Sequence, residues 1–194
     1  MQSNNIRQHF RQLRRNLTAT EQKQHAQQVK HWIHQTLSRK KNKRVAAYLA
    51  TQGEISVNAW ITEAAGHHIY LPKLYEHTQP ELRFAPLNTT TRWSYNRFSI
   101  AEPDNHWGDT LHARQLDYIL LPLVAFDRHG RRMGMGGGYY DRTLAFRNRR
   151  TAWLSPKLIG IAHSLQEHEG LPENPWDVRL DMIITEKEII HAKV

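Results

Sequence analysis

The sequence contains no cysteine among its 194 residues. Disulfides, thiolate metal ligands and a cysteine nucleophile are therefore excluded, and the usual marker of a small secreted scaffold is missing. Nowhere do about eighteen apolar residues run together, the length that a membrane-spanning helix needs. The polar N-terminus has no apolar core of the kind that signal peptides carry. These absences predict a cytoplasmic protein.

Acidic residues are scarce: 18 Asp and Glu stand against 27 Lys and Arg, which gives a formal net charge of +9. Apolar residues make up 39% of the chain, enough for a folded core, but 194 residues are too few for two large domains. We therefore expect one domain over residues 1–194, with an anionic partner. The charge gives only the sign of that partner, since nucleic acids, phosphorylated molecules and polycarboxylates would all be attracted.

Two helices are predicted at the N-terminus. Apolar residues at helical spacing, with arginines between them, predict a basic amphipathic helix over residues 5–16. A capping-box pattern from Thr18 to Glu21 opens a second periodic segment over 19–37. The lysine and arginine run at 39–44 ends it, and we interpret this run as a solvated connection rather than an anion-steering patch.

The rest of the chain alternates β-type apolar runs with helical segments. Strands are expected at 45–50, 68–71, 82–87, 117–126 and 157–162, a strand or terminal hairpin at 182–185 and 188–190, helices at 56–65 and 139–148, and a long loop at 88–110. Pro72 is expected to end its strand and Pro86 to favour a sheet edge. This rhythm predicts an α/β fold: a three-layer Rossmann-like domain with a mostly parallel central sheet and an N-terminal helical pair.

Five of the ten glycines lie between residues 130 and 138. Glycine allows positive φ and close approach of a ligand, and successive free amides before a helix form an anion-binding concavity. The segment matches neither the Walker nor the dinucleotide-binding pattern, because Tyr139 and Tyr140 follow the last glycine. We interpret it as a phosphate cradle after the central strand, where such sheets open into a ligand crevice. The alternative is a flexible strand-to-helix turn.

Charged side chains accompany these glycines. Arg128, Arg131, Arg132 and Arg142 lie close in sequence, and Asp141 falls in the first turn of the following helix. A carboxylate beside bound phosphates is repelled unless a cation lies between them, so Asp141 indicates Mg²⁺. The alternative is a carboxylate that stabilises the start of the helix.

The segment from Leu121 to Arg142 resembles the signature of the 5-formyltetrahydrofolate cyclo-ligase family, also called methenyltetrahydrofolate synthetases. Three further blocks resemble the family in the same order: RRNLT at 14–18, YLATQGE at 48–54 and WDVRLDMIITE at 176–186. The resemblance implies an ATP- and Mg²⁺-dependent cyclisation of 5-formyltetrahydrofolate to 5,10-methenyltetrahydrofolate, with release of ADP and phosphate, in one-carbon metabolism. It implies catalysis by positioning and charge stabilisation, with no protein nucleophile.

The resemblance also implies the site residues. The ATP-contacting positions are Arg7, Gln8, His9, Phe10, Arg11, Arg132, Met133, Gly134, Met135, Gly136, Gly137, Gly138, Tyr139 and Tyr140; the folate-contacting positions are Leu49, Glu54, Met135, Gly136, Gly137, Gly138 and Tyr139; the metal-binding positions are Asp141 and Asp181. Arg7 stands where many members have lysine. Without the family, Leu49 is a core residue and Glu54 a turn residue, although a carboxylate can bind the N–H edge of a pterin in bidentate fashion.

Two other functions compete with this one. A basic nucleic-acid-binding module would explain the charge, but seven arginines between residues 128 and 150 favour one anionic pocket. A sugar-phosphate-binding α/β protein would share the cradle without a reason for Asp141 and Asp181. The histidines lack His-Glu-x-x-His spacing and receive no role, whereas Trp107 is a candidate for ligand stacking. We expect small-molecule substrates, no nucleic-acid or membrane partner, and a monomer.

Overall fold

The computed structural model describes residues 3–64, 66–75, 80–150 and 155–192. The helices are α1 (Ser3–Arg15), α2 (Ala19–Leu37), α3 (Asn58–Glu63) and α4 (Tyr139–Leu144). The strands are β1 (Lys43–Ala46), β2 (His67–Tyr75), β3 (Glu81–Pro86), β4 (Trp93–Tyr95), β5 (Ala101–Pro103), β6 (Tyr118–Pro122), β7 (Ala125–Phe126), β8 (Arg132–Met133), β9 (Lys157–Ile161), β10 (Met182–Ile184) and β11 (Ile189–His191). Short 3-10 helices are η1 (Trp107–Asp109), η2 (Ala113–Gln115), η3 (Ala145–Arg149) and η4 (Ser164–Gln166).

The central feature is a seven-stranded sheet with the order β11-β10-β9-β6-β1-β2-β3. Strands β10, β9, β6, β1 and β2 pair in parallel, and the two edge strands, β11 and β3, pair antiparallel with their neighbours. The predicted α/β fold with a mostly parallel sheet is thus confirmed. After β1 the chain continues on the β2 side of the sheet, whereas after β6 it continues on the β9 side. The carboxyl ends of β1 and β6 therefore flank the topological switch point, where such sheets bind ligands.

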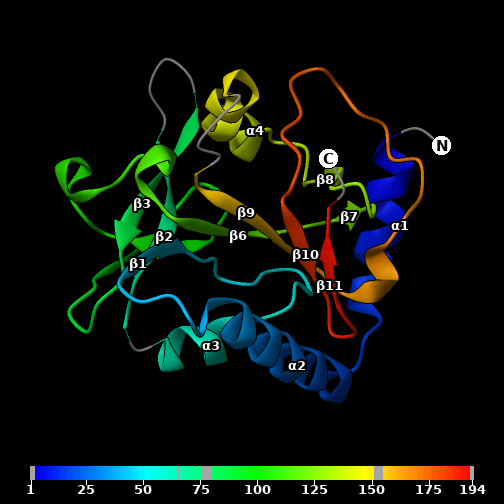
Figure 1. The fold of residues 1–194 in the computed structure, drawn as a ribbon, viewed down its shortest axis with the longest axis horizontal. Helices are drawn as coiled ribbons and strands as arrows, with labels where there is room; N and C mark the ends of the chain where they lie inside the picture. The colour runs from blue at the N-terminus through cyan, green and yellow to red at the C-terminus, as the bar shows by residue number, and fades with distance from the viewer. Residues whose placement is uncertain (1–2, 65, 76–79, 151–154, 193–194) are drawn as a thin grey trace.

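Neighbouring residues of each strand face opposite sides of the sheet, and helices cover both. Val45 packs in the cluster that contains Val29 of α2 and Trp60 of α3. Ala46, the next residue, packs in the cluster with Phe126 and Leu144. Figure 1 shows α2 and α3 on one side of the sheet and α4 on the other. Burial of these apolar side chains accounts for the expected three layers.

Helix α1 lies beside β7 and β8 instead of joining the layer of α2 (Figure 1). Its residues Ile6 and Phe10 are buried with Val124 and Met133, whereas α2 buries Val29 in the cluster under the sheet. Both predicted N-terminal helices exist, and their buried apolar residues belong to separate clusters. No helix in the described ranges combines the length and apolar character needed to cross a membrane.

The prediction that a strand ends at Pro72 is wrong. Strand β2 does not stop at Pro72 but continues to Tyr75, paired with β3. Pairing of β2 with β1 ends at Tyr70, and the N–H of Leu74 points to the Glu102 carboxylate instead of β3. Backbone N–H groups two residues apart in a strand point to the same side. Pro72 therefore lacks its N–H on the same side as Leu74, away from β3, where β2 no longer pairs with β1. The expected edge position of β3 is confirmed.

Three other segments differ from expectation. The stretch 117–126 is divided into β6 and β7, and β7 pairs with β8 as a separate hairpin. The expected loop at 88–110 contains the antiparallel pair β4 and β5. The expected helix over 139–148 consists of the six-residue α4 followed by η3. The C-terminal hairpin of β10 and β11 is confirmed.

Candidate active site

A buried arginine connects the two loops at the switch point. Arg14, at 0% exposure, donates from Nη1 to the carbonyl of Leu123 at 2.9 Å, just after β6. Its Nη2 donates to the carbonyl of Gln52 at 3.2 Å, in the turn that follows β1. Burial lowers the pKa of this guanidinium. The sequence analysis placed Arg14 only on a basic helix flank, and the RRNLT block was the one signal of a special role.

Glu54 sits in the same turn as a largely buried carboxylate. Its side chain is 9% exposed, and Oε1 lies 4.0 Å from Arg14 Nη1. The Thr51 N–H donates to Oε2 at 2.9 Å. Burial raises the pKa of Glu54 despite these partners. The side chains of Tyr48 and Tyr140 are close enough that the Glu54 charge adds to the effect of burial and raises the pKa of both phenols.

Leu49, the other predicted folate-contacting position before the glycine segment, is partly buried against the core beneath the sheet.

The turn between Leu49 and Glu54 is supported by a hydrogen bond from His163. Its Nε2 lies 3.1 Å from the carbonyl oxygen of Gly53, and because a carbonyl only accepts, this nitrogen must carry the proton. His163 is fully buried, and burial lowers its pKa to about 4. A neutral imidazole therefore holds the residue that precedes Glu54.

The β7–β8 hairpin leads into the glycine segment. Gly136 and Gly138 have φ values of +99° and +64°, a region that L side chains rarely adopt. Within the part of the chain that the structure describes, the backbone N–H groups of residues 134–138 donate to no protein acceptor. Helix α4, with six residues, is too short to contribute much of a dipole. The cradle therefore depends on loop amides and nearby side chains.

Helix α1 brings two of its predicted ATP-contacting arginines to these loops. Arg7 Nε donates to the Gly134 carbonyl at 3.0 Å, and Arg11 Nη2 donates to Gln52 Oε1 at 2.7 Å. One helical turn thus spans from the glycine segment to the turn after β1. Of the residues between them, Gln8 and His9 are exposed, whereas Phe10 is buried in the core under α1.

Arg132 and Asp141 form an ion pair at the glycine segment, with Nη2 and Oδ1 2.5 Å apart and side chains 6% and 26% exposed. The Nε atoms of Arg132 and Arg11 are buried and have no hydrogen-bond partner. The unpaired Arg132 donor, at the glycine segment with its unpaired backbone amides, suits a bound anion. The exposed oxygen of Asp141 keeps lone pairs free for a cation next to that anion.

Aromatic residues flank the glycines. The Tyr139 hydroxyl accepts from Arg97, and its ring meets Phe98 edge-on at 6.1 Å. Arg142 lies over the Tyr139 ring at 5.1 Å and donates to the Gly137 carbonyl at 2.7 Å. Exposed apolar side chains here, including Phe98 at 53% and Met135 at 46%, offer a surface for a flat ligand.

Asp181 is bound by its own set of donors. Its Oδ2 accepts from Arg147 at 2.7 Å and from the Leu158 N–H at 2.7 Å, while Oδ1 accepts from Lys157 at 3.0 Å. Burial raises its pKa, but these donors outweigh burial and lower it overall. The structure therefore gives the two predicted metal ligands separate cationic partners.

The arginines predicted around the cradle are likewise divided. Arg128 pairs with Glu167 and Glu188, and Arg131 Nε pairs with Glu173 at 2.9 Å. The expectation that the arginines of 128–150 line one anionic pocket does not hold for Arg128 and Arg131, because carboxylates far away in the sequence neutralise them. Arg132 and Arg142 remain at the glycines.

Trp107, the candidate for stacking, is 40% exposed. Its ring already packs edge-on against Tyr75 at 4.8 Å and carries the Lys73 ammonium at 4.9 Å. These contacts make Trp107 an anchor for the β4–β5 region rather than a free stacking surface.

A mostly parallel sheet, buried charged groups at its switch point and a following loop with free backbone amides define an α/β protein with a candidate anion-binding loop. Comparison with known proteins specifies it further. The profile of the 5-formyltetrahydrofolate cyclo-ligase family matches residues 1–186. The chain belongs to this family.

Relatives and solved structures agree with this assignment. The 5-formyltetrahydrofolate cyclo-ligase of Haemophilus influenzae is 38% identical over 177 residues, covering 90% of this chain and 92% of that protein. The Escherichia coli K12 protein of the same name is 37% identical, covering 75% and 79%.

The NMR structure of the Aquifex aeolicus 5,10-methenyltetrahydrofolate synthetase superimposes with a TM-score of 0.83 at 29% identity, covering 100% of this chain and 94% of that one. The Mycoplasma pneumoniae synthetase gives a TM-score of 0.74 at 28% identity, covering 96% and 99%. The predicted family, its α/β fold and the assignment to the cyclo-ligase enzymes are thereby confirmed.

Proposed function

We propose that the protein cyclises 5-formyltetrahydrofolate to 5,10-methenyltetrahydrofolate at the expense of ATP, with Mg²⁺ as cofactor. The observation that carries the proposal is the buried Glu54 carboxylate, whose charge acts on the Tyr140 phenol directly after the glycine segment. A pterin N–H edge would supply the donors that this carboxylate lacks. The name carried by the H. influenzae relative, a 5-formyltetrahydrofolate cyclo-ligase, supports the same substrate.

ATP would bind through its phosphates to the glycine segment. The free amides of 134–138 and the unpaired Nε atoms of Arg11 and Arg132 supply donors of the right charge. Arg7, already bonded to Gly134, adds a further cation at the loop. Of the other ATP-contacting positions, Gln8, His9, Phe10, Met133 and Tyr140 would help to shape the site. The folate would lie between Leu49, Glu54 and the stretch from Met135 to Tyr139.

The chemistry requires two displacements. The formyl oxygen attacks the γ-phosphorus, and ADP leaves. N10 of the folate then attacks the activated formyl carbon, the C–O bond breaks, phosphate leaves and N10 loses its proton. No side chain forms a covalent bond in this sequence, so the chain contributes by holding the two substrates in line and by placing positive charge at the phosphates.

Asp141 is the residue that fits Mg²⁺, which when bound would neutralise charge on the phosphates. Its carboxylate is 26% exposed and held by a single arginine. We keep Asp181 as a second proposed ligand, although Arg147 and Lys157 would have to leave its oxygens first.

We further propose a monomeric, cytoplasmic enzyme with one domain over residues 1–194 and small-molecule substrates, without nucleic-acid or membrane partners. The ion pairs of Arg128 and Arg131 support this, since they remove charge that a nucleic-acid surface would need.

The test is direct. Purified protein is mixed with MgATP and 5-formyltetrahydrofolate, and the ultraviolet absorbance of the methenyl product is followed. Product is expected only when ATP and Mg²⁺ are both present. Folded protein that gives no product at several pH values would overturn the assignment. A parallel binding assay with labelled RNA and DNA distinguishes the nucleic-acid alternative.

A further inference from the structure

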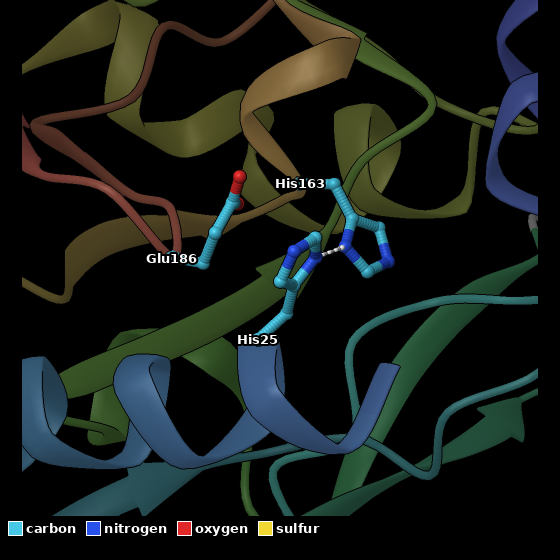
Figure 2. Close-up of side chains that lie close together, drawn as sticks. All are labelled: His25, His163 and Glu186. Carbon is cyan, nitrogen blue, oxygen red and sulfur yellow. Dashed lines mark hydrogen bonds between the residues drawn. The ribbon is translucent and has the colours of Figure 1, made fainter. Parts of the chain in front are cut away.

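Three side chains that the proposed reaction does not use converge from distant parts of the chain (Figure 2). His25 comes from α2, His163 precedes η4, and Glu186 lies between β10 and β11. One ligand atom from each lies within 4.8 Å of the others. The two Nδ1 atoms of His25 and His163 are 2.8 Å apart.

The protonation state of His163 is fixed by its surroundings. Its Nε2–H donates to the Gly53 carbonyl, so in the neutral ring Nδ1 holds the lone pair. Burial, which lowers the pKa to about 4, keeps the ring neutral at physiological pH. A histidine that donates one ring N–H to a backbone carbonyl and presents the other nitrogen is the arrangement found in metal-ligating histidines.

Glu186 is oriented in a comparable way. Its carboxylate accepts from the backbone N–H of Ser164 at 2.8 Å and from the Ser164 hydroxyl. Burial raises its pKa, but these hydrogen bonds outweigh burial and the shift is downward overall. The carboxylate is therefore ionised and held in place by Ser164, with one oxygen within 4.8 Å of a ring nitrogen of each histidine. His25 and Glu186 are only partly buried, which leaves a path from solvent.

We propose that His25, His163 and Glu186 form a binding site for a divalent transition metal such as Zn²⁺, with water in the remaining position. Two imidazole nitrogens and one carboxylate are a ligand set that Zn²⁺ accepts in open sites. Imidazole favours Zn²⁺, Co²⁺ and Ni²⁺ over Mg²⁺. This metal is distinct from the magnesium proposed at Asp141.

Metal binding would replace the hydrogen bond between His25 and His163 with bonds from both rings to the ion. Without metal, His25 Nδ1–H donates to the lone pair of His163 Nδ1. With metal, both Nδ1 atoms bind the ion, and the proton of His25 moves to its Nε2, or to solvent if the ring was charged. The ion then links α2, the start of η4 and the β10–β11 turn. Through the Gly53 carbonyl it also stiffens the turn that carries Glu54.

The experiment uses the full chain, freed of metal with a chelator and titrated with Co²⁺ and then Zn²⁺. We expect one Co²⁺ per chain with visible d–d absorption, displacement by Zn²⁺ but not by millimolar Mg²⁺, and a higher melting temperature with Zn²⁺. His25→Gln and Glu186→Gln should each weaken Co²⁺ binding by about 100-fold or more, beyond the roughly 10- to 100-fold cost of losing an outer-shell partner. His129→Gln, an exposed histidine elsewhere, is the matched control and should bind as the wild type does.

Absence of stoichiometric Co²⁺ binding to the wild type would overturn the proposal, as would unchanged binding by a folded His25→Gln variant. Both variants change partly exposed side chains, and circular dichroism checks that they fold. Asp141→Asn should keep the Co²⁺ spectrum while losing ATP-dependent turnover. The metal site and the cyclo-ligase activity can therefore fail independently.

Discussion

At the scale of single residues, the candidate site depends on charges that burial has made unfavourable. Glu54 is held in a site that raises its pKa, so its ionised form costs stability as pH rises through that pKa. A buried carboxylate kept at such a cost, with a weak 4.0 Å arginine contact, is expected to have a ligand as its partner.

Glu54→Gln should therefore separate stability from function. The glutamine keeps an acceptor for the Thr51 N–H but removes the buried charge, so the melting temperature at neutral pH should stay level or rise. Folate binding should weaken by about 10- to 100-fold, the loss of a hydrogen bond to a charged group. Calorimetric melting and the KM for 5-formyltetrahydrofolate measure the two effects. A variant that loses stability and keeps its KM would exclude the binding role.

Asp141 and Asp181 allow a second comparison, because one is proposed as a free ligand and the other sits in a cationic network. Asp141→Asn should lower ATP-dependent turnover by about 100-fold or more, since a metal stabilises phosphoryl charge by several kcal/mol. Asp181→Asn should lower turnover less than Asp141→Asn, because Arg147 and Lys157 occupy the Asp181 oxygens, and should also lower stability by about 1–3 kcal/mol, because Arg147 loses its anion. Steady-state kinetics across a Mg²⁺ titration, with urea unfolding of both variants, tests this. Equal kinetic losses with unchanged stability would make both carboxylates metal ligands.

At the scale of elements, α1 connects separate loops through hydrogen bonds from its arginine side chains. Arg7, Arg11 and Arg14 follow one helix face and reach the glycine segment, the turn after β1 and the end of β6. Periodicity predicts the helix, but which loops it bridges depends on where β1 and β6 end in space. Sequence analysis therefore found the element and missed the role of Arg14.

Arg14→Met should weaken the connection between α1 and these loops. The Gln52 carbonyl would lose its side-chain donor and the Leu123 carbonyl would keep only Gln166 Nε2, at a cost of about 1–3 kcal/mol. The Glu54 carboxylate would also lose its nearest cation, so KM for the folate should rise. Urea unfolding and kinetics measure both, with Arg15→Met, at the neighbouring exposed position, as control. Equal stability of the two variants would show that the hydrogen bonds of Arg14 do not stabilise the fold.

At the scale of the whole molecule, buried His163 makes stability depend on pH. Its pKa is about 4 in the folded protein, against 6.5 for an ordinary histidine. Between these values the unfolded chain binds more protons, so stability is complete above about pH 6.5 and falls as pH drops toward 4. His67 and His112 have pKa values shifted in the same direction, also chiefly by burial.

We expect the metal-free protein to lose about 3 kcal/mol of stability from this histidine between pH 6.5 and 4, at about 1.4 kcal/mol per pKa unit. His163→Gln should be less stable at pH 7 but show a shallower slope in this range. Chemical unfolding at half-unit pH steps gives both slopes. Parallel slopes for the two proteins would assign the acid sensitivity to other groups.

The sequence alone determined the features that arise locally. Apolar spacing and the Thr18 capping box specify helices, and the glycines at 136 and 138 specify a backbone that other residues rarely adopt. Only the tertiary structure decided which charges are neutralised. In the folded protein Arg128 pairs with carboxylates far away in the sequence, Arg132 Nε has no hydrogen-bond partner, and Glu54 is buried. Such pairings join residues far apart in the chain, and no local pattern encodes them because they depend on how the strands are ordered in the sheet.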